Sequence, residues 1–403
     1  MDKANPQLKR TLSLSAMVFY GLGTIIGAGI YVLIGEIVGQ AGAWAPLSFV
    51  LAAVIASFTG LSYAELVGRY PRSAGEAVYV EEAFKQPWLT QLVGWSVVLT
   101  GLVSGSTLLK GFAGYFISLF GGVDYAVISI ALLLMCLLAC VGVKQSVGVA
   151  VLITILEIGG LLLVVLVSSE ALTTVENWDR WQQALPNPSW VGISAAAFLA
   201  FYAFIGFEDM VNMAEEVKDA STNLPKAIII TTIVSTIIYV LVAFVAVVAI
   251  PIEELAESAA PLTAIVSASS WFPAPLLSVI SVVAILNGAI VQLLMAPRVV
   301  YGITRSSSRL KFLSIINQRT QTPVIATIAV SAFMLVFALL LPLAQLAQLT
   351  SAIILCLFIL VNAALLVFKR RETYDGFQVY RWVPVLGVVF SLLLLLMQIN
   401  FHY

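Results

Sequence analysis

Eleven apolar runs, each about as long as a helix that crosses a lipid bilayer, divide this chain of 403 residues. A transmembrane helix needs roughly 17–25 mainly apolar residues. Only 10% of the residues are charged, against about 25% in soluble proteins. The sequence therefore predicts an all-α, polytopic membrane protein with about eleven transmembrane helices. They are expected near residues 14–38, 44–67, 91–119, 124–142, 148–168, 190–214, 227–250, 276–302, 323–341, 346–368 and 383–401.

Positive charges between the runs predict how the helices are oriented. Lysine and arginine collect in loops on the cytoplasmic side of a membrane. With the N-terminus inside, all but Lys110 and Arg180 of the 20 lysines and arginines fall on or beside cytoplasmic segments. We therefore expect a multi-pass protein of the cell membrane with a cytoplasmic N-terminus and an outside C-terminus. The outer segment 169–189 is expected to form a lid or short helix, segment 251–275 a solvated rim, and the inner segment 68–87 a short surface helix.

The first apolar run contains four glycines. Residues 20–31 read YGLGTIIGAGIY, and each glycine costs a helix about 1 kcal/mol relative to alanine. We expect the helix to break at Gly27 to Gly29. A break within lipid leaves backbone groups unpaired, which is tolerated where they line a cavity. The alternative is that Gly23 and Gly27 serve only close helix packing.

The sixth run carries Gly206 followed by the carboxylates Glu208 and Asp209. Ionisable residues within membrane segments are costly and functional by default, and we expect a second interruption just before Gly206. Interrupted helices at matching places in two halves indicate a transporter's substrate site. Because the first half comprises five spans, an odd number, the second half enters the membrane from the opposite side. We predict one domain over 1–403, with an inverted five-plus-five repeat (about 11–168 and about 190–369) and an extra helix at about 383–401.

Two broken helices would present complementary charges to a ligand. Free N–H groups at the start of a half-helix suit a carboxylate, and free carbonyls at the end of one suit an ammonium. The pattern predicts a transporter for a zwitterion or an amine. The single histidine is His402, and no nucleophile–base pair, metal-ligand cluster or cofactor motif is visible, so no catalytic residue, metal or cofactor is expected. A net charge of −1 without a basic tract gives no reason to expect nucleic acid.

Four motifs resemble those of the amino acid–polyamine–organocation transporter superfamily, in particular bacterial permeases similar to cationic amino acid transporters. GTIIGAGIY at 23–31 looks like the family's first-helix motif. YAEL at 63–66 with RYPRSAGE at 69–76 is similar to its second helix and following loop. FIGFE at 204–208, running to EEVK at 215–218 and Leu224-Pro225, looks like the sixth helix. APRVVYG at 296–302 resembles the end of the eighth.

The resemblance implies alternating access around a central substrate. By position, the backbone of Ala28 and Gly29 would hold a substrate carboxylate, and the carbonyls of Ile25, Tyr202 and Ile205 would hold its amine. Further polar or small residues could line the side-chain pocket, or could be satisfied between helices in a structural role. These are Gly101, Ser104, Asn287, Gln292, Thr350 and Ser351.

Two departures from the family pattern bear on coupling. The superfamily usually has twelve spans, so one peripheral helix is missing from the eleven predicted here. Relatives in this branch commonly carry a lysine at the position of Glu157, and a carboxylate there could bind a cation or a proton instead. Glu208 matches a glutamate of branches that carry arginine, agmatine or putrescine. Alternatively, Glu157 is a hydrogen-bonded packing residue.

The sequence thus predicts a secondary active transporter that moves amino acids, with proton coupling or exchange as open alternatives. The alternative substrate is a polyamine or cationic amine, with Glu157 and Glu208 as counter-charges. From another class, the same fold could form an ion channel or a sensor that binds without transporting. The expected partners are the small-molecule substrate, membrane lipid and a coupling proton or cation; no accessory subunit is indicated.

Overall fold

A computed structural model describes residues 10–27, 29–72, 75–141, 147–186, 188–305 and 310–400. Within these ranges the regular structure is helical, and the β-type pairing is confined to an isolated bridge between Leu12 and Val217. The longer helices are α1 (Leu14–Ile26), α2 (Gly29–Ala41), α3 (Ala45–Arg69), α5 (Pro87–Phe120), α6 (Asp124–Val141), α7 (Val147–Val167), α9 (Trp190–Tyr202), α11 (Ala220–Ala249), α14 (Ala274–Thr304), α15 (Val324–Leu340), α16 (Leu343–Arg371) and α17 (Trp382–Asn400). The shorter ones are η1 (Gly42–Trp44), α4 (Gly75–Phe84), η2 (Ser168–Thr173), α8 (Val175–Ala184), α10 (Phe207–Val211), α12 (Ile252–Glu257), α13 (Pro261–Ser267) and η3 (Lys311–Ser314).

Eight stretches of the described chain are helical, long and apolar enough to cross a membrane. One of them, Leu14–Arg69, contains α1, α2 and α3 together. Two further apolar helices, Val324–Leu340 and Trp382–Gln398, are shorter than the others. This composition and length fit a polytopic, all-helical membrane protein.

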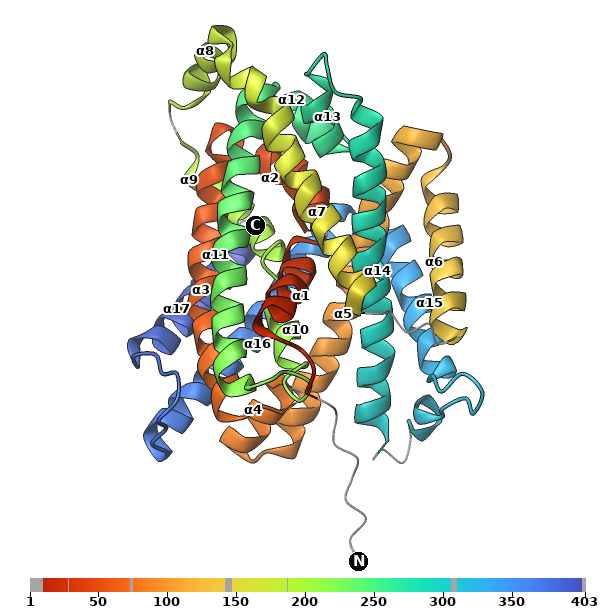
Figure 1. The fold of residues 1–403 in the computed structure, drawn as a ribbon, viewed down its shortest axis with the longest axis vertical. Coiled ribbons are helices and arrows are strands. Elements are labelled where there is room, and N and C mark those ends of the chain that lie inside the picture. The colour runs from red at the N-terminus through yellow and green to blue at the C-terminus, as the bar shows by residue number, and fades with distance from the viewer. Residues whose placement is uncertain are drawn as a thin grey trace, which may run out of the picture.

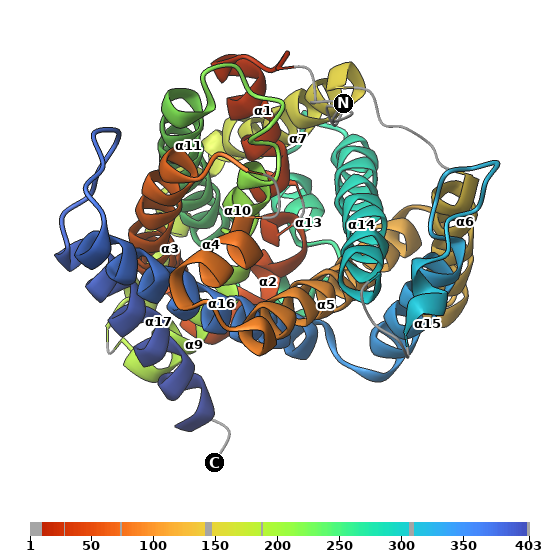
Figure 2. The same cartoon turned by 90° about the horizontal axis from the view of Figure 1, so that it is seen from below.

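The interrupted helices lie inside the bundle. Figure 2 shows α10 and α2 enclosed by longer helices, among them α3, α5, α11, α14 and α16. The pairs α5 with α14 and α3 with α11 pack along much of their length. Helices α6 and α15 lie side by side at one edge (Figure 1). The long helices therefore form a frame around the short segments.

Short helices cover both ends of the frame. In Figure 1, α8, α12 and α13 lie at the upper end and α4 lies at the lower end. Segment 251–275 is more than the solvated rim that the sequence suggested. Its acidic side chains are exposed, but Leu255 and Leu262 are fully buried, because α12 and α13 pack against α2. The apolar residues between the glutamates therefore pack into the bundle, although the glutamates themselves are exposed.

Buried ion pairs join three segments at the end that carries α4. The Glu65 carboxylate on α3 is fully buried and lies 2.6 Å from Arg69 Nη2 and 2.6 Å from Lys369 Nζ on α16. The backbone N–H of Val379, in the α16–α17 connection, donates to the same carboxylate at 2.8 Å. Buried charges are tolerated when they are paired and hydrogen-bonded. Glu65 therefore fixes α16 and the following segment to the end of α3.

Replacing Glu65 by glutamine should destabilise the protein, because Arg69 and Lys369 would keep their charges without a counter-charge. Breaking a buried pair costs about 3–5 kcal/mol, and a clear fall in the thermal unfolding midpoint of the purified protein is expected. Glu81→Gln is the matched control, since Glu81 is exposed on α4. Equal midpoints for the two variants would show that the pairing does not hold these segments together.

Candidate functional site

The first interruption lies between α1 and α2. Helix α1 ends at Ile26, and the Gly27 N–H still donates to the Gly23 carbonyl at 3.1 Å. Helix α2 then starts at Gly29. Ala28, which the sequence analysis placed in the site, lies outside the described residues. The chain thus leaves regular helix within a segment that is apolar on both sides.

The second interruption lies between α9 and α10. Helix α9 ends at Tyr202 and α10 begins at Phe207, with turns between them. Gly206 has a φ of 135°, which L side chains rarely adopt. A Cβ on Gly206 would lie 2.6 Å from the Thr24 carbonyl carbon. Glycine is therefore required there by both the backbone angle and the space.

The two interruptions touch each other. A Cβ on Gly29 would lie 2.5 Å from the Cα of Ala203, so the two backbones approach more closely than any side chain would permit. The Thr24 hydroxyl donates to the Gly206 carbonyl at 3.0 Å. The two interruptions, whose bonded residues are 182 positions apart in the chain, are thereby in direct contact.

A tyrosine of α11 satisfies carbonyls from both interruptions. The Tyr239 hydroxyl lies 2.6 Å from the Ile25 carbonyl oxygen and 2.9 Å from that of Ala203. Its proton is shared between the two acceptors, or donated to either. Tyr239 is fully buried, so these carbonyls have little access to solvent. The Ile25 carbonyl, an expected amine ligand, is thus also an acceptor for this hydroxyl.

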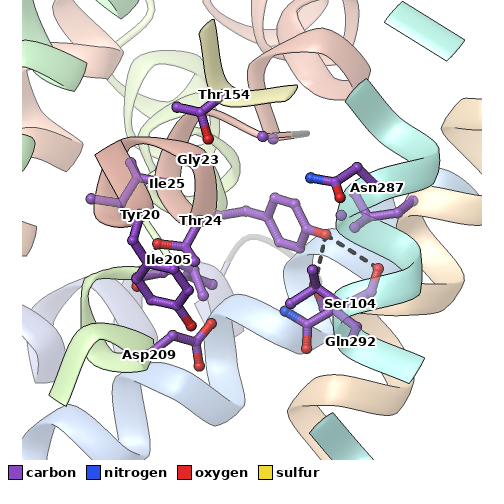
Figure 3. Close-up of a pocket in the computed structure, with 17 residues that line it drawn as sticks. Tyr20, Gly23, Thr24, Ile25, Ser104, Thr154, Ile205, Asp209, Asn287 and Gln292 are labelled. Carbon is purple, nitrogen blue, oxygen red and sulfur yellow. Dashed lines mark hydrogen bonds between the residues drawn. The ribbon is translucent and has the colours of Figure 1, made fainter. Parts of the chain in front are cut away.

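A cavity of about 100 Å³ lies against both interruptions (Figure 3). Most of the residues expected at the site line it. The lining residues are Tyr20, Gly23, Thr24, Ile25, Gly27, Gly29, Ser104, Leu108, Thr154, Tyr202, Ile205, Gly206, Asp209, Asn287, Gly288, Val291 and Gln292. Across it, the Tyr202 hydroxyl and Ser104 Oγ lie 2.9 Å apart. We refer to this space as the central cavity.

Five of the named candidates do not line the central cavity. Thr350 is buried on α16, and its hydroxyl donates to the Leu346 carbonyl at 3.0 Å. Gly101 and Glu208 line a second, smaller cavity. Glu157 is fully buried behind the wall. Ser351, considered with Thr350, is also buried, and its hydroxyl lacks a hydrogen-bond partner within the described chain.

Glu157 lies next to the first interruption. Asn287, a lining residue, donates from Nδ2 to Glu157 Oε1 at 3.3 Å, and a Cβ on Gly27 would lie 3.6 Å from the same oxygen. Oε2 is buried and has no hydrogen-bond partner among the described residues. The backbone carbonyl of Glu157 accepts from the Tyr31 hydroxyl at 2.5 Å. Glu157 therefore has one carboxylate oxygen free to take a proton or a cation.

The second cavity, of about 40 Å³, adjoins the central one through a shared wall of Ile205, Asp209 and Gln292. It is also lined by Glu76 and Glu208. Glu208 is turned back on its own helix, because its Oε2 accepts from the Gly206 N–H at 2.8 Å. We refer to this space as the inner cavity, since it lies toward α4.

Sequence reasoning missed four polar side chains of the central cavity: Tyr20, Thr24, Thr154 and Asp209. Thr24 lies within the glycine-rich stretch and could have been named from its position. Tyr20 and Thr154 carry no comparable signal. Asp209 stood beside Glu208 in the same motif, but the family resemblance pointed to Glu208. Within the described ranges, no group of three or more His, Cys, Asp or Glu side chains could hold a metal ion.

Tyr239→Phe tests whether the hydroxyl holds the interruptions together. Removing it leaves at least one buried carbonyl unsatisfied, which costs about 1–3 kcal/mol, so the thermal unfolding midpoint should fall. Tyr125→Phe removes a hydroxyl from an exposed residue of α6 and should leave the midpoint nearly unchanged. An unaltered midpoint for Tyr239→Phe would contradict the assigned role.

Glu76 on α4 should make stability depend on pH. Burial raises the pKa of its carboxyl from 4.5 to about 7, with hydrogen bonds from the backbone and from Tyr63 opposing the rise. The folded protein thus keeps this proton up to about pH 7, whereas the unfolded chain loses it near pH 4.5. Stability from this group is complete below pH 4.5 and is lost as the pH rises to about 7.

Unfolding midpoints measured from pH 5 to pH 8 should therefore fall less steeply for Glu76→Gln than for the wild type. Glu81→Gln, exposed on the same helix, should follow the wild-type profile. Parallel profiles for Glu76→Gln and the wild type would rule out Glu76 as the source of the pH dependence.

Comparison with known proteins is consistent with this geometry. A vacuolar cationic amino acid transporter 4 of Arabidopsis thaliana is 29% identical over 386 residues, covering 90% of this chain and 64% of the relative. The branched-chain amino acid permease BcaP of Bacillus subtilis is 28% identical over 416 residues, covering 96% of this chain and 88% of the relative. Human cationic amino acid transporter 4 is 26% identical over 389 residues. The chain spans less than two thirds of the length of the plant and human relatives, at 64% and 61%.

A family model described as amino acid permease matches residues 10–402, nearly the whole chain. The names of the family and of these relatives are those of transporters, not enzymes. Together with the apolar helices, the match identifies a multi-pass membrane protein. The chain belongs to the amino acid permease family of the amino acid–polyamine–organocation transporter superfamily.

Proposed function

We propose that this protein is a secondary active transporter that moves amino acids across the membrane by alternating access. One observation carries the proposal: the two interrupted helices meet, and residues of both interruptions line one cavity. The start of α2 at Gly29 offers N–H groups to a carboxylate, and the carbonyls of Ile25, Tyr202 and Ile205 suit an ammonium. An α-amino acid bears both groups.

The same proposal includes the topology. The described ranges contain three helices within Leu14–Arg69 and two apolar helices of lesser length, which is compatible with eleven spans. We propose an inverted repeat, because each half opens on an interrupted helix, and a single domain over the whole chain. Lysine and arginine cluster at the end of the bundle that carries α4. This favours a cytoplasmic N-terminus, with that end of the bundle on the cytoplasmic side of the cell membrane.

Glu157 and Glu208 are the proposed coupling residues. Both are buried within membrane-spanning stretches, where unneutralised carboxylates are costly. The free Oε2 of Glu157, next to Gly27, supports exchange of a proton or cation at the first interruption. Glu208 is bonded to the second interruption through Gly206. Changes in the charge of either carboxylate would act directly on an interrupted helix.

The second candidate function is transport of a polyamine or cationic amine. The negative charge of the site favours it, because Asp209 is the one acidic or basic residue among the described residues that line the central cavity. Glu157 and Glu208 would then act as counter-charges. The names of relatives include both cationic and branched-chain amino acid carriers, and experiment must separate these substrates.

Uptake into proteoliposomes tests both functions. Labelled alanine, arginine and putrescine should be offered with and without an inward proton gradient. If coupling runs through Glu157 and Glu208, then Glu157→Gln and Glu208→Gln should reduce gradient-driven uptake to the level without a gradient. Glu253→Gln, exposed on α12, should behave as the wild type.

Failure of all three substrates to move would refute the transport proposal. Ion currents much faster than one substrate per conformational cycle would indicate a channel, and substrate binding without counterflow would indicate a sensor. Gradient-driven uptake that persists in both glutamine variants would refute the assigned coupling residues.

A further inference from the structure

Neither candidate function assigns Asp209 a contact with a particular part of the substrate. It lines both the central and the inner cavity, and with Ile205 and Gln292 it forms the wall that they share. In Figure 3 it lies near Tyr20 and Ile205 at the border of the central cavity. The neighbouring Glu208 does not line the central cavity and uses one oxygen on the Gly206 N–H. Asp209 is therefore the carboxylate that a ligand in the central cavity would meet.

The described surroundings of Asp209 contain no balancing cation. No lysine or arginine is found among the described residues that line either cavity. The ion pairs within the described part of the chain involve the acids Glu65 and Glu82. The inner cavity instead adds Glu76 and Glu208. A carboxylate in a membrane interior calls for a positive partner, and here a ligand can supply it.

The place of Asp209 relative to the interruptions fixes which part of an amino acid would reach it. The α-carboxylate and α-ammonium are held at the helix ends, near Gly29 and Ile25. A side chain leaving that point can pass along Ile205, which lines both cavities. Ile205 suits an apolar stem, while Asp209 and Gln292 beside it suit a polar head. Lysine and arginine side chains have this build, an apolar stem with a charged end.

We propose that Asp209 is a specificity-determining residue that binds the cationic end of a substrate side chain at the boundary between the two cavities. This inference rests on the proposed transport of amino acids and names the substrates: α-amino acids with a terminal ammonium or guanidinium. The charge of Asp209 selects them over neutral side chains of equal length. Glu76 and Glu208 line the inner cavity but not the central one, so they do not replace Asp209.

The test compares pairs of ligands that differ in the terminal group. Lysine and norleucine have equally long stems, and norleucine lacks the ammonium; arginine and citrulline form a second pair. Binding to the purified full-length protein should be measured by calorimetry for wild type, Asp209→Asn and Asp179→Asn. Asp179 is exposed on α8, away from both cavities, and provides a control with the same chemical change.

The wild type and Asp179→Asn should bind lysine at least about tenfold more tightly than norleucine, the range expected for a hydrogen bond to a charged group. In Asp209→Asn, lysine and norleucine should bind with about equal affinity, chiefly because lysine binds more weakly. An unfolding midpoint close to that of the wild type would show that this variant is folded. Asp209→Glu, which keeps the charge, should retain most of the preference.

Three results would overturn the inference. The first is norleucine binding as tightly as lysine in the wild type, which leaves amino acid transport intact but removes the charge selection. The second is an unchanged lysine preference in folded Asp209→Asn. The third is no binding of any of the four amino acids, which would also refute the proposed function. Failure of the inference and failure of the function are thus distinguishable.

Discussion

Backbone polar groups freed by two helix interruptions must be satisfied inside an apolar bundle, and much of this structure depends on that constraint. Lipid offers no hydrogen bonds, so buried hydroxyls provide them. Tyr239 bonds the carbonyls of Ile25 and Ala203, and Thr24 bonds that of Gly206. These bonds join α11 and α1 to the turns after α9 and so stabilise both interruptions.

A second set of buried tyrosines extends this scaffold. The Tyr115 hydroxyl on α5 donates to the Tyr31 carbonyl on α2 and accepts from the Leu262 N–H on α13. The Tyr31 hydroxyl in turn donates to the Glu157 carbonyl on α7. Hydrogen bonds of this kind connect the first interruption to helices far along the chain. The Tyr31 bond therefore fixes α2 to α7 at the residue whose carboxylate lies beside Gly27.

Two carboxylates lie at different places around the central cavity. Glu157 lies behind the wall at the first interruption, next to Asn287, while Asp209 lies at the boundary with the inner cavity. A transporter needs one group that senses the coupling ion and another that contacts the substrate. Their separation on different helices is compatible with the two proposed roles being distinct, whereas the sequence predicted Glu157 and Glu208 together as coupling residues or as counter-charges for a cationic amine.

The sequence by itself determined the class of the protein and the places where two helices are interrupted. Long apolar runs with few charges require a helical membrane protein, and glycine-rich stretches place the weak points of the helices at Gly27 and Gly206. Only the tertiary structure decided which side chains face the cavity. Adjacent residues on a helix point about 100° apart, so the rotation of α10, set by packing against α1, α4 and α11, turns Asp209 toward the cavity and Glu208 back to Gly206. Likewise, Thr350 and Gly101 have suitable chemistry, but the packing of α16 and α5 directs them elsewhere. Orientation around a helix axis depends on contacts between distant segments, and sequence order alone does not contain them.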